Sequence, residues 1–240
     1  MKEENQESSS PFVRFRDIIP QERMSMLRVG IVGAGGIGAP CALALAKMGV
    51  HHMEIWDPDV VGQENIGCQM YSSKHIGNFK VNTLKNFLRR QAEWCQVQAH
   101  AEMYRAETRH DCHVIISAVD SLRARREIWK SINHETCELV VDPRMGAEVL
   151  NVFSVIPKED GEWYETTIQG VGVQEKCTAK STFHCGLIAG AMAAREVKAW
   201  LVEERSMVEY TIDLRHMGLL GMHQDVRMQV HEKSKGEAAA

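Results

Sequence analysis

The chain has 240 residues, of which 44% are hydrophobic and 25% are charged, a composition typical of a soluble globular protein. It has 28 Lys and Arg residues against 32 Asp and Glu residues, and the resulting net charge of −4 argues against nucleic-acid binding by bulk electrostatics. No apolar stretch is long enough to cross a bilayer and the polar N-terminus carries no secretory signal, so we expect no membrane partner and a cytoplasmic location.

Apolar runs alternate with helical patterns along the first part of the chain. Residues 1–11 are polar and rich in serine, which predicts a disordered tail. The pattern then predicts strands over 28–33, 52–57, 97–103, 113–119 and 138–142, and helices over 37–48, 78–92 and 121–133. This alternation predicts an α/β fold, a Rossmann-like doubly wound sheet that is mostly parallel.

After residue 142 the pattern changes. The runs VLNVFSVIP (149–157) and WYETTI (163–168) predict two strands around a turn at 158–161, which would extend the sheet in antiparallel fashion. An amphipathic helix is predicted over about 182–203 and a last strand over 208–214. We therefore expect a single domain over 12–215 and a partly disordered tail over 216–240.

The first predicted strand runs directly into Gly33-Ala34-Gly35-Gly36-Ile37-Gly38 and then into a helical pattern. This strand–turn–helix unit binds nucleotide phosphates on backbone N–H groups at a helix N-terminus. Gly33 allows the tight turn, Gly35 and Gly36 let the backbone approach the phosphates, and Gly38 allows close helix packing. Asp57 follows nineteen residues after Gly38 and ends the second strand, where a carboxylate can accept hydrogen bonds from ribose hydroxyls.

Four further polar residues follow the predicted strands or begin the helices behind them. Asn65 would orient the phosphates, Lys80 would neutralise their charge, and Asp120 would hold Mg²⁺ beside them. Arg125, one turn into the next helix, would also contact the nucleotide. Two structural roles stay open, since Asp120 can cap that helix and Arg125 can pair with a neighbouring acid.

At this point the chain resembles the ThiF/MoeB adenylyltransferases, whose superfamily contains the ubiquitin-activating enzymes. The resemblance covers about residues 12–203 and rests on GAGGIG, DPDVVGQEN, GNFK, DSLRAR and the segment CTAKSTFHCGLIAGAMAAREVKAWL. It implies that ATP, with Mg²⁺, adenylates the C-terminal glycine of a ubiquitin-like or sulfur-carrier protein. It also implies a homodimer in which Arg16 reaches the ATP site of the other subunit.

Two departures from the family pattern concern the cysteines. Cys68 stands where family members usually have an arginine on the phosphates. The paired C-x-x-C motifs of many members are missing, so we expect no structural zinc. The scattered cysteines indicate reduced thiols instead.

Cys177 is the expected nucleophile. The resemblance places it in the family's Cys-Thr pair, and Lys176 and Lys180 beside it favour the thiolate. An acyl group would then pass from the adenylate to Cys177 as a thioester. Cys185, on the helix that follows, is expected in the core.

Two other functions remain open from the sequence. The same glycine loop serves NAD(P)-dependent oxidoreductases, although the residues after 142 offer no obvious His–acid or Tyr–Lys pair. A nucleotide-binding partner subunit with weakened catalysis is the other, and Cys68 favours it.

Overall fold

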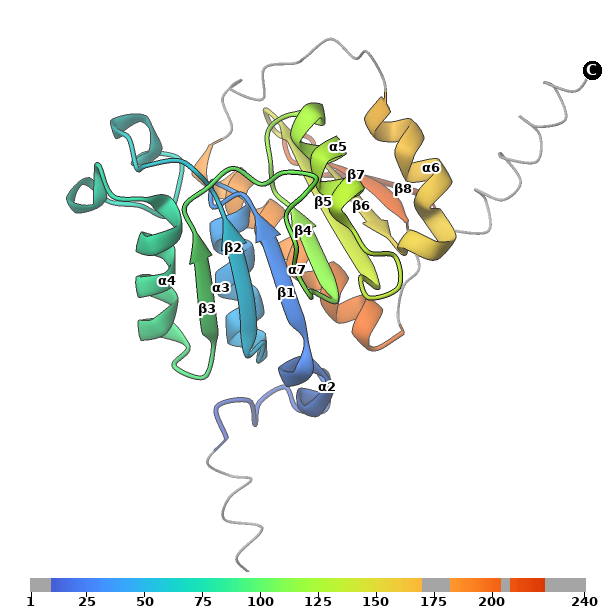
Figure 1. Cartoon of the computed structure of the whole chain (residues 1–240), viewed down its shortest axis with the longest axis horizontal. Coiled ribbons are helices and arrows are strands. Elements are labelled where there is room, and N and C mark those ends of the chain that lie inside the picture. The colour runs from blue at the N-terminus through green and yellow to red at the C-terminus, as the bar shows by residue number, and fades with distance from the viewer. Residues whose placement is uncertain (1–9, 170–181, 204–207, 223–240) are drawn as a thin grey trace, which may run out of the picture.

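The computed structural model describes residues 10–169, 182–203 and 208–222, and these form one layered α/β unit (Figure 1). Its sheet has eight strands in the order β3-β2-β1-β4-β5-β6-β7-β8. The first five strands run parallel to one another: β1 (Arg28–Val32), β2 (His52–Trp56), β3 (Gln96–His100), β4 (Val114–Ser117) and β5 (Leu139–Gly146). The predicted strands of this half are confirmed, with ends shifted by a few residues.

Three antiparallel strands complete the sheet: β6 (Val149–Val155), β7 (Glu209–Asp213) and β8 (Gly218–Met222). The antiparallel C-terminal extension is therefore confirmed. The structure carries the sheet past residue 215, because β8 pairs with β7 inside the segment expected to be a tail. Residues 223–240 of that segment, and residues 1–9 of the expected N-terminal tail, lie outside the described residues.

Helices cover both faces of the sheet and enclose two hydrophobic clusters (Figure 1). One cluster lies under α3 (Gly38–Met48), α4 (Lys80–Gln91) and α7 (Phe183–Leu201), and the other under α5 (Leu122–Ser131) and α6 (Pro157–Gln169). Successive side chains of a strand point to opposite faces, and in β4 Val114 and Ile116 enter the first cluster while Ile115 enters the second. The short helix α2 (Gln21–Met26) precedes β1.

The predictions of a turn at 158–161 and of a strand over 163–168 were wrong, because both segments belong to α6. Pro157 begins the helix, and the Asp160 carboxylate accepts a hydrogen bond from the Ile156 amide at its first turn. Asp160, Tyr164 and Ile168 are buried at a four-residue spacing, which is helical. The aromatic and β-branched composition of WYETTI suggested a strand, but the spacing of the buried residues decided the structure.

Helix α7 packs closely against α3 through small residues. A Cβ atom on Gly190 would lie 2.7 Å from the Cys41 amide nitrogen and 2.8 Å from the Ile37 carbonyl oxygen, so only glycine fits there without a shift of the helices. Gly186, one turn earlier, faces the carbonyl of Gly36 in the same way. The start of α7 is thereby fixed beside the glycine loop.

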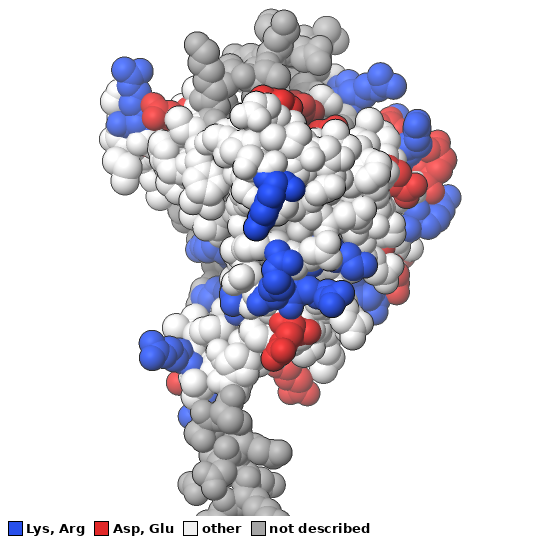
Figure 2. Space-filling view, turned by 90° about the vertical axis from the view of Figure 1, so that its left-hand side faces the viewer, with Lys and Arg blue, Asp and Glu red and all other residues white. Residues whose placement is uncertain are grey.

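The surface charge is uneven. Figure 2 shows Lys and Arg side chains gathered on the side of the molecule where α4 lies, and the last turn of this helix carries Arg89 and Arg90. The exclusion of nucleic acid rests on the net charge of the whole chain and stays a prediction. None of the helices in the described ranges combines the length and the apolar character that a membrane span needs.

Candidate functional site

The glycine loop, residues 33–38, connects β1 to α3. Gly33 adopts φ of 101°, and a Cβ atom there would lie 2.3 Å from the Ala118 carbonyl oxygen. Both the left-handed backbone and the close contact require glycine. The first turn of α3 begins at Gly38, so the positive end of its dipole lies beside the loop, as the binding of a phosphate requires.

Two side chains from other segments hold this loop at Ala34. The Asp57 carboxylate accepts a hydrogen bond from the Ala34 amide at 2.7 Å and, through its other oxygen, one from the Asp59 amide at 2.8 Å. The Tyr71 hydroxyl donates to the Ala34 carbonyl at 2.6 Å. Burial raises the pKa of Asp57, and the two amides oppose that rise. Asp57 therefore stabilises the loop, a role that sequence analysis did not assign, and Tyr71 carried no recognisable signal.

Lys80 is the buried cation next to this loop. Its ammonium binds the Asp59 carboxylate at 2.7 Å, and its side chain is only 7% exposed against 61% for that of Asp59. Asn65 lies in the connecting segment, where its side-chain oxygen accepts a hydrogen bond from the Gly62 amide at 2.9 Å. The structure thus collects Asp57, Asn65 and Lys80 in one wrapped segment, residues 57–80, that packs on the glycine loop.

Asp120 lies at the carboxyl end of β4, two residues after Ala118, whose carbonyl contacts Gly33. Ser121 caps α5, since its hydroxyl accepts a hydrogen bond from the Ala124 amide at 3.2 Å. The alternative role of Asp120 as the helix cap was therefore wrong. Asp120 is exposed beside the loop, and its carboxylate has no hydrogen-bond or ion-pair partner within the described part of the chain.

Arg125 belongs to a buried charge network. Its guanidinium binds Asp142 at 2.8 Å, and the same carboxylate binds Arg144 at 2.8 Å and accepts a hydrogen bond from the Tyr164 hydroxyl at 2.8 Å. Burial alone would raise the pKa of Asp142, but the two guanidinium groups outweigh it and lower that pKa overall. The structure thus realises the pairing of Arg125 with an acid, and its contact with a nucleotide stays a prediction.

Arg16 lies in the segment before α2, at the opposite end of the sheet from the glycine loop (Figure 1). Helix α2, which follows, is tied to that end by its first residue, Gln21, whose side-chain amide donates to the Met48 carbonyl at the last turn of α3. The Arg16 side chain is 51% exposed and lies 3.8 Å from Asp17. Arg16 is therefore remote from the glycine loop of its own chain.

Sequence analysis singled out Cys177 and Cys68, and the structure describes the second of them. Cys177 lies outside the described residues. Cys68 is half-buried, and its thiol donates to the Glu64 carbonyl at 3.3 Å. The Cys68 carbonyl faces Gly36, so the residue that replaces the usual arginine lies beside the glycine loop.

A family model described as the ThiF family matches residues 9–236. The NEDD8-activating enzyme E1 catalytic subunit of Caenorhabditis elegans is 30% identical over 149 residues, which make up 58% of this chain and 32% of that protein. The adenylyltransferase and sulfurtransferase uba4 of Aspergillus fumigatus is 44% identical over 70 residues, 29% of this chain and 14% of that protein. The matches thus span a third or less of these curated relatives.

The fold also matches solved structures. The structure of E. coli MccB with AMPCPP and MccA superimposes with a TM-score of 0.73 at 14% identity, covering 90% of this chain and 71% of that one. At this identity the likeness concerns the fold, and it agrees with the Rossmann-like sheet described above.

The Asp142 network gives a test of stability against pH. The pKa of Asp142 is lower in the folded protein, so its carboxylate adds stability above the unfolded pKa and loses it as pH falls through the folded pKa. Asp142→Asn should lower the free energy of unfolding at neutral pH by about 3–5 kcal/mol. The deficit should shrink below about pH 4, where the unfolded wild-type chain takes up its proton. Urea unfolding at several pH values measures both effects.

Asp111→Asn is the matched control, because Asp111 is 70% exposed and pairs with Arg28 at the surface. It should cost less than about 1 kcal/mol at any pH. A deficit for Asp142→Asn that is the same at acid and neutral pH would contradict the role assigned to the charge.

Proposed function

Because this chain belongs to the ThiF family, we propose that it is an ATP-dependent adenylyltransferase acting on the C-terminal glycine of a ubiquitin-like or sulfur-carrier protein, or of a peptide. A carboxylate oxygen of that glycine attacks the α-phosphorus of ATP. The bond from this phosphorus to the bridging oxygen of the β-phosphate breaks, and pyrophosphate leaves with the electron pair. The product is an acyl-adenylate.

The buried Lys80 ammonium is the observation that carries this proposal. It lies in the segment packed on the glycine loop, and its ammonium binds the carboxylate of the exposed Asp59. A cation held there would neutralise the charge of the triphosphate. Adenylyl transfer requires this neutralisation because pyrophosphate leaves, whereas hydride transfer does not. The NAD(P)-dependent alternative gives no reason for a buried ammonium at this place.

The remaining residues complete the nucleotide site. The N–H groups of Gly35 and Gly36 would donate hydrogen bonds to the phosphates, and the Asn65 side chain would orient them. Each oxygen of the Asp57 carboxylate accepts a hydrogen bond from one backbone amide. The remaining lone pairs would accept hydrogen bonds from ribose hydroxyls. Asp120 offers the oxygen ligand that Mg²⁺ prefers, and the bound ion would neutralise phosphate charge.

A second candidate function rests on Cys68. With a thiol in place of the usual arginine beside Gly36, the chain could bind a nucleotide as the weakened partner of an active subunit. In the first proposal, the Lys80 ammonium supplies the positive charge that the replaced arginine would have brought to the phosphates. Catalysis of exchange between ATP and pyrophosphate separates the two candidates.

Binding of ATP with Mg²⁺, and no binding of NADH, is the first expected result. Lys80→Met should weaken ATP binding about 10- to 100-fold, since a hydrogen bond to a charged group contributes about 1.5–3 kcal/mol. Isothermal calorimetry with both nucleotides measures this. Lys85→Met on the same helix is the control and should keep the wild-type affinity. Tight NADH binding without ATP binding would refute the proposal.

We further propose a cytoplasmic homodimer in which Arg16 acts on the nucleotide of the other subunit. Arg16→Ala and Asp120→Ala should each lose ATP–pyrophosphate exchange about 100-fold or more. When the two inactive proteins are mixed and allowed to exchange subunits, one site of each mixed dimer is complete, so about a quarter of the activity should return. The assay uses as acceptor a small ubiquitin-like or sulfur-carrier protein that ends in Gly-Gly.

The matched control is Asp111→Ala, because Asp111 precedes β4 at one end of the strand and Asp120 follows it at the other. It should retain exchange. Mixtures that stay inactive although mixed dimers form, or a monomeric mass in solution, would contradict the composite site.

Cys177 is proposed to take the acyl group from the adenylate. Its thiolate would attack the acyl carbon, AMP would leave, and a thioester would form. With ATP and the same acceptor, wild-type enzyme should form a covalent adduct that thiols reverse. Cys177→Ala should lose the adduct and keep pyrophosphate exchange. An adduct that survives in Cys177→Ala and disappears in Cys68→Ala would show that Cys68 is the nucleophile and would contradict the role proposed for Cys177.

A further inference from the structure

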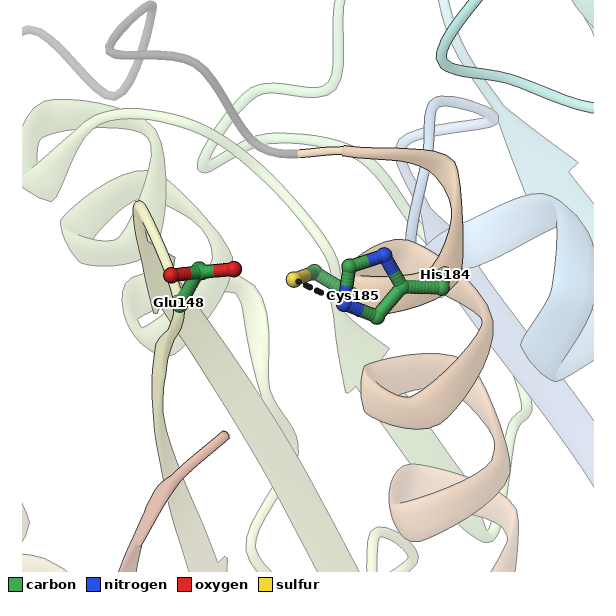
Figure 3. Close-up of side chains that lie close together, drawn as sticks. All are labelled: Glu148, His184 and Cys185. Carbon is green, nitrogen blue, oxygen red and sulfur yellow. Dashed lines mark hydrogen bonds between the residues drawn. The ribbon is translucent and has the colours of Figure 1, made fainter. Parts of the chain in front are cut away.

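Three metal-ligating side chains meet where the first turn of α7 faces the turn between β5 and β6 (Figure 3). His184 and Cys185 come from the helix, and Glu148 comes from the turn, where Ala147 adopts a positive φ of 52°. One ligand atom from each of the three lies within 4.8 Å of the others. None of the three has a part in the adenylation site described above.

We propose that Glu148, His184 and Cys185 bind a divalent transition-metal ion of the zinc class. Sulfur, imidazole nitrogen and carboxylate oxygen are the donors that such an ion takes in a tetrahedral site, whereas Mg²⁺ requires oxygen. The Cys185 sulfur lies 3.5 Å from the His184 Nε2. Bonds of about 2.3 Å to sulfur and about 2.0 Å to nitrogen at a tetrahedral angle place two such ligands about 3.5 Å apart.

A hydroxyl behind the ligands supports the assignment. The Thr182 hydroxyl oxygen lies 2.8 Å from the His184 Nδ1, and the hydroxyl donates a hydrogen bond to the Cys185 sulfur at 3.2 Å. When the histidine Nδ1–H donates to this hydroxyl, the Nε2 lone pair points toward the cysteine sulfur. Metal-binding histidines are oriented in this way by a partner on their other nitrogen.

The charges and the access also suit an ion. Cys185 is fully buried, whereas His184 is exposed, so the ligand set is fixed on one side and open to solvent on the other. No ion pair holds Glu148 within the described ranges. On binding, the Cys185 thiol releases its proton to solvent, and thiolate and carboxylate together balance the two positive charges of the ion.

The position suggests what the ion does. Gly186 follows Cys185 directly, and a Cβ atom there would lie 2.5 Å from the carbonyl of Gly36 in the glycine loop. The ion would therefore join the β5–β6 turn to the start of α7 beside that loop. Three protein ligands leave the fourth tetrahedral position to water.

The test titrates the purified, chelator-treated full chain with Co²⁺ and records its absorption spectrum. We expect one Co²⁺ per chain, a thiolate-to-cobalt charge-transfer band, tetrahedral d–d bands, and displacement of all of these by Zn²⁺. Cys185→Ser should abolish the charge-transfer band. Glu148→Gln and His184→Ala, whose side chains are not in the core, should weaken binding more than tenfold, and Thr182→Val should weaken it about tenfold.

Cys68→Ser and His216→Ala are the matched controls, since neither residue lies in the cluster, and both should keep the wild-type spectrum. Circular dichroism establishes that each variant is folded. Three outcomes would overturn the proposal: no stoichiometric Co²⁺, a charge-transfer band that persists in Cys185→Ser, or unchanged affinity in both Glu148→Gln and His184→Ala. These results do not depend on whether the chain adenylates a protein.

Discussion

The hydrogen bond from the Ala34 amide to the Asp57 carboxylate connects the ends of β1 and β2 at the glycine loop. Tyr71 binds the carbonyl of the same residue from a third segment, so the loop is held on both sides of Ala34. Loop and carboxylate stabilise each other, because the amides favour the charge and the charge holds the turn. The wrapped segment that carries Asn65 and Lys80 packs against this point, so these contacts hold the residues of the proposed nucleotide site together.

The parallel half of the fold could be predicted because its central strands β1 and β4 are buried on both faces and read as short, uninterrupted apolar runs. The antiparallel half was harder to predict. In α6 the helical spacing of Asp160, Tyr164 and Ile168 competed with a strand-like composition. In β8 the exposed side chains of Leu219 and Leu220 leave no buried face, so neither periodicity nor burial marks the strand.

In the candidate site, sequence spacing predicted some residues, whereas their contact partners depend on the three-dimensional fold. Spacing along the chain predicted Asp57 and Asp120 at strand ends and Lys80 at a helix start, on the edge of the sheet where the glycine loop lies. Their partners depend on contacts that spacing does not encode. Asp59 pairs with Lys80 across twenty-one residues, and Tyr71 reaches Ala34 across thirty-seven. The cluster of Glu148 with His184 and Cys185 depends likewise on a turn and a helix that are distant in sequence.

The buried network around Asp142 constrains how this fold can evolve. Its members come from three elements: Arg125 on α5, Asp142 and Arg144 on β5, and Tyr164 on α6. Replacing Asp142 alone removes the carboxylate that two guanidinium groups share, a far larger cost than replacing the whole set by apolar side chains. In diverging lineages these four positions should therefore be kept or exchanged as a group. Covariation among them would be inherited from packing, and should not be read as a signature of substrate choice.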